Sequence, residues 1–578
     1  MGAFGLDALS SVAYGPDQIL YVLILAGSAG VALDMPIAFA IAGLLAIVAF
    51  SYRQTIYAYP NGGGSYTVAR ENLGTRAGLV AAAALMVDYL TTVAVSVTAG
   101  VAAIVAFAPG LNAHRVAIDV ALIVLIILVN LRGVREAGAA FVIPTYLFIG
   151  SLGALLVVGA LHLLISGTPP PARHLPEASE GVTIFLVLRA FAGGCTAMTG
   201  IEAIANGVPA FRRPPSRNAA GTLITLAAIL AVLFLGVTAL GHAIGAVPTD
   251  RANVIAQIGQ TFAGGSPLYY LVQVSSAIIL MLAANTSFNG FPRLAAVMAE
   301  DDWFPHRLSH RGFRLAYSNG ILAIGGAAIA LVVAFNGSTN ALIPLFAVGV
   351  FLCFTLSQTG MVRHWHSARG PHWLRKAVIN GTGALTTALV TVIVVATKFT
   401  QGAWIVTLLV PSLVGVFYWV HRHYGVTRAE LAIDHLPERP RERPQVIVPV
   451  AHLNRATAAA LSYARTIGDG VLAVHVAAED DPSTGIQDRW REWAGEGVPL
   501  RILESPYREV VSPLVDLVED LADRAEEPVT VVIPTIVPAH LWQEPLHNQI
   551  EYALSLALIG KPNVVIASVP VRLRGTAS

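Results

Sequence analysis

Apolar runs of roughly 17–25 residues recur through about the first 425 residues, and each is long enough to cross a bilayer as a helix. Length and hydropathy together predict about twelve membrane spans. The predicted spans are the region up to Gly27, Met35–Phe50, Ala77–Phe107, Val116–Leu131, Ala139–Ile165, Val182–Pro209, Ala219–Ile244, Leu268–Met298, Ser318–Phe335, Ala341–Val362, Ala377–Thr397 and Ala403–Val420. The pattern therefore predicts a polytopic α-helical membrane protein, with a transmembrane domain at 1–425.

The pattern changes after the last span, where short apolar runs alternate with amphipathic segments. A linker at 426–444, rich in Pro, Arg and Glu from His435 onward, leads into a predicted soluble domain at 445–578. Strands that alternate with helices predict a parallel α/β sheet. The predicted strands are Val446–Val450, Val471–Ala477, Leu500–Leu503, Val529–Pro534 and Val564–Val571, and the predicted helices are Arg455–Ile467, Glu509–Ala525 and Leu546–Leu558. A regulatory or dimerisation module without chemistry of its own is the interpretation we favour.

Two of the spans are interrupted by residues that break helices. The first span contains Tyr14-Gly15-Pro16, and the sixth contains Gly193-Gly194 followed by Thr196 and Thr199. Proline removes a backbone donor, so a break is expected there. Interrupted helices five spans apart indicate a transporter built from inverted repeats, here about 1–166 and 182–362, with a site at mid-membrane. The spans at 377–397 and 403–420 would be additional helices.

Asp7, Asp88 and Glu202 are acidic residues that lie within the apolar spans. An ionisable side chain in hydrocarbon is costly, so each marks a candidate functional site. Asp88, Thr92 and Ser96 follow at intervals of four and share one helical face. Carboxylate and hydroxyl oxygens favour hard cations over transition metals. The alternative is that the two hydroxyls only bond to carbonyls of their own helix.

Two further features within the spans allow both a functional and a structural interpretation. Ala283, Thr286 and Ser287 could form a second ion site, or could simply allow close helix packing. Arg189, four residues before Gly193, could neutralise an acid, form a gate or extend to the membrane surface.

Composition and charge narrow the class of protein. The chain is 55% hydrophobic and 12% charged, with a net charge of +1, which gives no indication of a nucleic-acid partner. Alternating loops differ in basic charge, and the poorer set holds little beyond Arg115, Arg173, Arg251 and Lys398. The positive-inside rule then places both termini in the cytoplasm. We find neither a catalytic triad nor a metal motif, and therefore do not expect an enzyme or a cofactor.

Four motifs resemble the amino acid–polyamine–organocation superfamily, and within it the KimA-type bacterial potassium importers. They are Asp7-Ala8-Leu9-Ser10-Ser11-Val12-Ala13-Tyr14-Gly15-Pro16, Tyr59-Pro60-Asn61-Gly62-Gly63-Gly64-Ser65-Tyr66, Thr196-Ala197-Met198-Thr199-Gly200-Ile201-Glu202-Ala203 and Ala284-Asn285-Thr286-Ser287-Phe288. The tail, with Pro545-Leu546-His547-Asn548-Gln549, is similar to the soluble domain of that branch, which resembles universal stress proteins.

The resemblance implies a LeuT-type fold of five plus five helices and potassium uptake by proton symport across the bacterial cell membrane. It implies a homodimer formed through the cytoplasmic domains, and inhibition by cyclic di-AMP. The implied potassium ligands are Asp7, Tyr14, Asp88, Thr92, Ser96 and Thr199, and the implied proton-coupling residues are Glu202 and Asp88. Phe346 stands where the family typically offers a tyrosine hydroxyl, and only six residues precede Asp7, which indicates a start further upstream or an altered inner gate.

Two alternatives remain open from the residues alone. An amino acid or polyamine permease of the same fold, driven by protons or sodium, would use the same carboxylates for an amine-bearing substrate. A membrane-bound sensor would bind a ligand without moving it. The acids would repel an anionic substrate head. In addition, Ser10-Ser11-Val12-Ala13-Tyr14 occupies the place where amino acid permeases have a glycine-rich break that holds a substrate carboxylate. Lipid is the remaining partner that the spans imply.

Overall fold

The computed structural model describes residues 5–62, 64–107, 109–132, 137–166, 177–249, 252–309, 317–432, 444–478, 483–494, 497–505, 509–538 and 550–573. Arg173, Arg251, most of the linker and the tail motif at 545–549 lie outside these residues. The chain forms two compact units, Met1–Ala432 and Ile433–Ser578, and each is described by itself.

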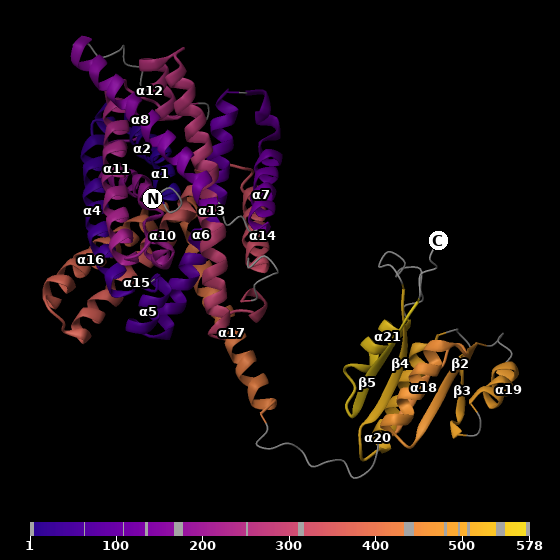
Figure 1. The fold of residues 1–578 in the computed structure, drawn as a ribbon. Coiled ribbons are helices and arrows are strands. Elements are labelled where there is room, and N and C mark those ends of the chain that lie inside the picture. Colours follow the sequence, from indigo (N-terminus) through magenta and orange to yellow (C-terminus); the bar gives the residue numbers. More distant parts are fainter. Residues whose placement is uncertain are drawn as a thin grey trace. The chain divides into compact units, whose positions relative to one another are not determined.

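The first unit is a bundle of helices (Figure 1). Among the described residues, eleven segments are long and apolar enough to cross a membrane, and the shorter α14 is also apolar. The elements are α1 (Leu6–Ser10), η1 (Ser11–Ala13), α2 (Gly15–Leu23), η2 (Ile24–Ala26), α3 (Gly27–Val31), α4 (Asp34–Ala58), α5 (Ser65–Leu73), α6 (Thr75–Phe107), η3 (Pro109–His114), α7 (Arg115–Leu131), α8 (Ala137–Ser166), α9 (Ile184–Gly194), η4 (Cys195–Met198), α10 (Ile201–Asn206), η5 (Val208–Ala210), α11 (Pro215–Ala243), α12 (Val254–Ala263), α13 (Pro267–Glu300), η6 (His306–Leu308), α14 (Ser318–Ala334), α15 (Thr339–Ala368), α16 (Trp373–Lys398), η7 (Phe399–Gln401) and α17 (Ala403–Glu430).

The predicted polytopic fold is confirmed, and the differences lie at the ends of helices and in short helices. α4 and α17 extend eight and ten residues beyond the predicted ends at Phe50 and Val420. Hydropathy marks only the part of a helix that lies in lipid, so polar extensions are not seen in it. The short helices α5 and α12 were not predicted, because each is shorter than a span.

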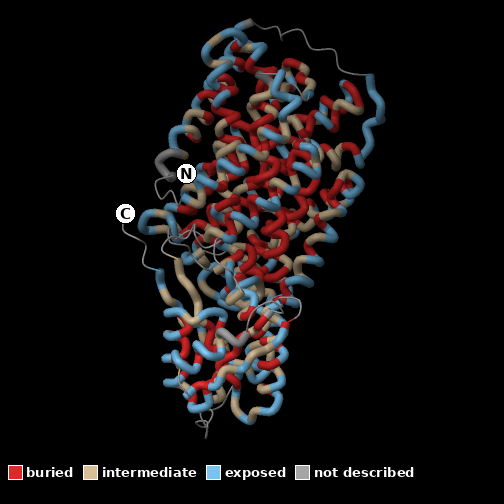
Figure 2. Tube along the Cα trace, turned by 90° about the vertical axis from the view of Figure 1, so that its right-hand side faces the viewer, coloured by how far each residue is buried: buried red, intermediate tan, exposed pale blue. Residues whose placement is uncertain are grey.

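The bundle has an inner set and an outer set of helices. Buried residues concentrate in its interior (Figure 2). The most apolar window of Thr75–Val105 is 83% buried, whereas that of Gly110–Leu131 is 11% buried. α6 is therefore a central helix that other helices surround, and α7 has most of its surface free to face lipid.

Two ends of the bundle are used below as reference points. α12 lies at one end, and α5 lies at the opposite end together with the end of α17 (Figure 1). We refer to them as the α12 end and the α5 end. The first and sixth spans are both broken near the middle, as predicted.

The second unit is a five-stranded parallel sheet with order β3-β2-β1-β4-β5, which confirms the predicted α/β domain. Its elements are β1 (Val446–Pro449), α18 (Arg455–Ile467), β2 (Val471–Ala478), α19 (Ser483–Ala494), β3 (Leu500–Ser505), α20 (Val511–Arg524), β4 (Val529–Val537), α21 (Ile550–Leu558) and β5 (Val564–Arg572). Apolar cores cover both faces of the sheet, as parallel sheets require.

Candidate functional site: a cluster of oxygens between two broken helices

The breaks in the first and sixth spans lie against each other. The Ser11 hydroxyl of η1 donates a hydrogen bond of 2.9 Å to the carbonyl oxygen of Ala197 in η4. The helix resumes after Tyr14 on one side, and after the extended Thr199 and the left-handed Gly200 on the other. Broken helices leave backbone carbonyls without their usual partners, and such carbonyls can line an ion site.

Gly200 brings the sixth span into contact with Asp7. Its φ of +77° belongs to the left-handed region that favours glycine. A Cβ atom at this position would lie 2.5 Å from the backbone nitrogen of Ala8 and 3.0 Å from Asp7 Oδ2. Only a residue without a side chain fits between the two breaks, so Gly200 permits their close approach.

The structure gathers several of the predicted ligands at this junction. Tyr14 lies beside Thr199 and within electrostatic range of both Asp7 and Asp88. Asp88 comes from the central helix α6, where Thr92 lies beside its carboxylate. Two carboxylates, a phenol and two threonine hydroxyls from three spans therefore form one group.

Several oxygens of this group have unused hydrogen-bonding capacity. Among the described residues, the buried atoms Asp7 Oδ1, Asp88 Oδ1 and Thr199 Oγ1 have no hydrogen-bond partner. Buried polar atoms are almost always paired, so unpaired ones require an explanation. Oxygens alone, two of them carboxylate oxygens, are the ligand set of a hard cation.

The hydroxyls of α6 divide between structural and candidate functional roles. Thr91 and Thr98 donate to the carbonyl oxygens of Val87 and Val95 in their own helix, the ordinary behaviour of such side chains. Thr92 lies beside Asp88 instead, and Ser96 is buried one turn further along the same face. Thr92 and Ser96 therefore remain candidate ligands.

Glu202 has a partner that the sequence did not reveal. Its Oε1 accepts a 2.8 Å hydrogen bond from the backbone N–H of Ser65, the first residue of α5. A carboxylate at a helix N-terminus is favoured by the unpaired N–H groups and the helix dipole. The glycine-rich segment that ends at Gly64, directly before α5, was the available signal. Glu202 thus links the sixth span to the α5 end of the bundle.

A cavity of about 130 Å³ extends from Tyr14 toward the α12 end. Gln18 Nε2 donates to Asn340 Oδ1 at 3.2 Å across its lining, and Arg115 Nη2 donates to Thr339 Oγ1 at 3.4 Å. These residues did not stand out in the sequence, because amides and an arginine at helix ends have no distinctive spacing. The cavity gives the oxygen group a route to one side of the bundle.

The remaining predicted residues lie apart from this group or beside it. Arg189 donates to the side-chain oxygen of Gln401 at 3.0 and 2.6 Å and is absent from the cavity lining, so its role as a gate stays a prediction. Ala283, Thr286 and Ser287 lie on α13, against which α1 packs. Within the described part of the chain, Thr286 Oγ1 is a further buried atom without a hydrogen-bond partner.

Phe346 is buried on α15 and provides no oxygen. It precedes Gly349 by one turn. A Cβ atom on Gly349 would lie 2.9 Å from the carbonyl oxygen of Ala84 and 3.6 Å from the backbone nitrogen of Asp88. α15 therefore packs directly on the part of α6 that carries Asp88.

Comparisons with known proteins agree with this architecture. Residues 8–417 match the family model of amino acid permeases, and residues 441–571 match that of the KimA potassium transporter C-terminal domain. The chain is 41% identical over 574 residues to the potassium transporter KimA of Bacillus subtilis (strain 168), which covers 98% of this chain and 94% of that protein.

The fold and the position of the site define a multi-pass membrane transporter of the amino acid permease class. Within this class, the chain belongs to the KimA family.

A side chain at Gly200 tests whether the junction holds a cation. We expect Gly200→Ala to force Asp7 away from the sixth span, because the new Cβ has no room at a left-handed backbone position. The measurement is thermal stabilisation of the purified protein by potassium, rubidium and sodium chloride relative to choline chloride. We expect the apparent cation affinity to fall about tenfold or more, equivalent to about 1.4 kcal/mol.

Gly221→Ala on α11 is the matched control, because a Cβ there would meet no atom within 4 Å. It should respond to salts as the unchanged protein does. Equal stabilisation of both variants by a cation would contradict a site at this junction.

Proposed function

We propose that the protein is a secondary active importer of potassium ions that works by proton symport and alternating access. The observation that carries this proposal is the pair of carboxylates, Asp7 and Asp88, whose buried oxygens lack partners where two broken helices meet. The name of the relative from Bacillus subtilis supports potassium as the substrate. In this proposal Asp7, Tyr14, Asp88, Thr92, Ser96 and Thr199 hold the ion.

The charges of the site support coupling to a proton. Asp7 and Glu202 are buried, Asp88 is half-buried, and Asp88 lies within electrostatic range of the other two. Buried like charges repel strongly unless cations or protons neutralise them. One potassium ion and one proton together would neutralise two of the three carboxylates, which removes most of the repulsion among them. Movement of both together would then be favoured over movement of either alone.

Glu202 is suited to couple proton occupancy to the opening of the site. Its carboxylate bonds to the N-terminus of α5, and this contact is strongest while the carboxylate is charged. A proton on Glu202 weakens the contact and frees α5 to move. The site would then open toward the α5 end when the proton is bound.

The charge of the loops supports an orientation in the cell membrane. Helix α5 and the helices that contact it carry basic side chains that include Arg70, Arg76 and Arg363, so the positive-inside rule places the α5 end in the cytoplasm. The cavity next to Tyr14 then opens outward. Potassium would enter through it and leave past Glu202 and α5.

Asp88→Asn tests the substrate. The substitution keeps the shape of the side chain but removes its charge, so we expect potassium uptake to fall at least about a hundredfold, a loss of about 2.7 kcal/mol or more. The measurement is uptake of potassium, with rubidium as tracer, by the protein in liposomes under an inward proton gradient.

Asp516→Asn, on the exposed face of α20 in the second unit, provides the same chemical change away from the site and should leave uptake unaltered. Full potassium uptake by Asp88→Asn would contradict the assignment. Uptake of spermidine or lysine by the unchanged protein, without potassium uptake, would favour the amine permease.

Glu202→Gln tests the coupling. We expect potassium to equilibrate across the liposome membrane without accumulating, because glutamine keeps a hydrogen-bond acceptor for Ser65 but cannot release a proton. The measurement compares potassium uptake with and without a proton gradient. Uptake by the Glu202→Gln protein that still responds fully to the gradient would assign the coupling proton to another residue.

The second unit supports a homodimer. β5 is an edge strand, and Leu556 on the neighbouring α21 and Ile559 directly after that helix are each 77% exposed. Edge strands and exposed apolar side chains favour association.

We expect Leu556→Glu combined with Ile559→Glu to convert the dimer to a monomer, because the two charges oppose burial of this apolar surface. The measurement is the mass of the protein in detergent by light scattering. Asp488→Asn, on the exposed face of α19 beside the opposite edge strand β3, is the control, and an unchanged dimer in the double variant would contradict this interface.

A further inference from the structure

The turn that follows α13 joins two helices at the α5 end of the bundle. Its adjacent residues Asp301 and Asp302 bond in different directions: Asp301 contacts α5, and Asp302 contacts the last turn of α17. Neither residue belongs to the proposed ion site. Their contacts form two connected groups, which are described in turn.

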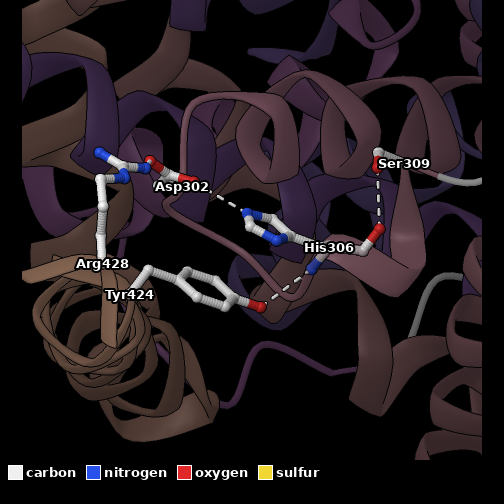
Figure 3. Close-up of polar contacts among 5 residues, drawn as sticks. All are labelled: Asp302, His306, Ser309, Tyr424 and Arg428. Carbon is white, nitrogen blue, oxygen red and sulfur yellow. Dashed lines mark hydrogen bonds and ion pairs between the residues drawn. The ribbon is translucent and has the colours of Figure 1, made fainter. Parts of the chain in front are cut away.

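Asp302 is the centre of the first group, which also contains His306, Tyr424 and Arg428 and is called the Asp302 cluster (Figure 3). Its Oδ1 lies 2.8 Å from His306 Nε2, and its Oδ2 accepts a hydrogen bond from Arg428. The backbone N–H of His306 donates to the Tyr424 hydroxyl at 3.1 Å, and the two rings stack at 4.0 Å. Four side chains thus join the turn to α17.

Aromatic contacts continue this attachment along α17. Trp303 stacks on His421 with ring centroids 3.9 Å apart and meets Tyr418 edge to face at 5.3 Å. Phe304 meets Phe417 in the same way at 5.7 Å. Such pairs have preferred geometries and exclude water, so the turn and the second half of α17 are expected to move together.

The Asp302 carboxylate keeps its negative charge at neutral pH. Hydrogen bonds from Arg428 and from His306 lower the pKa of Asp302 below its ordinary value of 3.8. Stability that comes from a lowered carboxylate pKa is present above the ordinary value and is lost only as the pH falls through the lowered one. The contact between Asp302 and Arg428 therefore persists at neutral and mildly acidic pH.

Asp301 extends the contacts from the turn to α5. Its carboxylate accepts a 2.9 Å hydrogen bond from the Tyr66 hydroxyl and forms an ion pair with Arg70. Arg70 also donates to the Tyr66 oxygen at 3.1 Å, so the three side chains hold one another. Tyr66 directly follows Ser65, whose N–H binds Glu202. Contiguous contacts therefore lead from α17 to a carboxylate of the proposed ion path.

We propose that Asp301 and Asp302 are positioning residues for transport: they hold α5 to α17, so that the end of α17 controls how readily α5 moves away from Glu202. This inference rests on the proposed role of Glu202. α17 is the last helix before the second unit, so any event in that unit that pulls on or releases α17 would alter the opening of the ion path.

Arg428→Gln tests this in the full-length protein in lipid nanodiscs. The first readout is hydrogen exchange of the α5 amides at residues 65–73, which we expect to become about three- to tenfold faster, because local opening of α5 no longer has to displace α17. Arg422→Gln is the matched control, because it makes the same charge change on the same helix outside the Asp302 cluster and should leave exchange in α5 unaltered.

The second readout is potassium uptake in liposomes. We expect Arg428→Gln to change the maximal rate by about two- to fivefold while the half-saturating potassium concentration stays within about twofold, because the ligands of the ion are untouched. Arg428→Lys keeps the charge and should restore most of the protection of α5. A role confined to the stability of α17 would leave α5 exchange and the maximal rate unaltered.

One further variant separates misfolding from release of α5. Tyr66→Phe removes only the hydroxyl that bonds to Asp301 and should speed exchange in α5 while leaving α17 unchanged. Equal α5 exchange in the Arg428→Gln, Tyr66→Phe and Arg422→Gln proteins would overturn the proposal. The exchange readout does not depend on which ion is carried, so an error in the proposed substrate would appear only in the uptake measurement.

Discussion

The cost of burying carboxylates in a membrane protein is the constraint on which the rest of the structure depends. Asp7, Asp88 and Glu202 lie within membrane-spanning segments, where a charge without compensation is strongly unfavourable. The N-terminus of α5 stabilises the charge of the Glu202 carboxylate. Among the described residues, Asp7 and Asp88 each keep a buried oxygen without a hydrogen-bond partner. A bound cation or proton would offset this cost. A cation offsets it directly, and the two broken helices place their polar backbone at the same position.

The candidate ion site combines residues of a continuous helix with residues of two interrupted helices. α6 is an unbroken helix of 33 residues, so Asp88 and Thr92 have fixed positions in the centre of the bundle. Tyr14 and Thr199 lie where helical hydrogen bonding is interrupted, and Asp7 lies on the short helix α1 directly before the first break. Interrupted segments can change their backbone angles at lower cost than a helix, and Gly200 allows them to meet closely. One half of the site is thus fixed while the other half can move, as alternating access requires.

The sequence was sufficient for features that repeat or stand out locally. Hydropathy located the membrane spans, and the alternation of strand and helix segments located the parallel sheet. Pro16 and Gly193 indicated the breaks in the first and sixth spans. It could not reveal contacts between distant segments, because neither partner is unusual alone. Ser65 and Glu202 are 137 residues apart, and Asp302 and Arg428 are 126 apart. Asp301 and Asp302 read as ordinary polar residues of a loop, although they join α5 to α17.

The absence of a hydroxyl at Phe346 can be accommodated by the same geometry. A monovalent ion needs several oxygens at moderate distances, and the site contains carboxylates, hydroxyls and the carbonyls released at two breaks. Two carboxylates also attract a cation more strongly than one hydroxyl does, because the full charges act in a low-dielectric surrounding. Phe346 is buried on α15, one turn before the position of Gly349 where α15 packs on α6. Loss of one neutral ligand should then alter the choice among ions of different size more than it alters the ability to bind a cation.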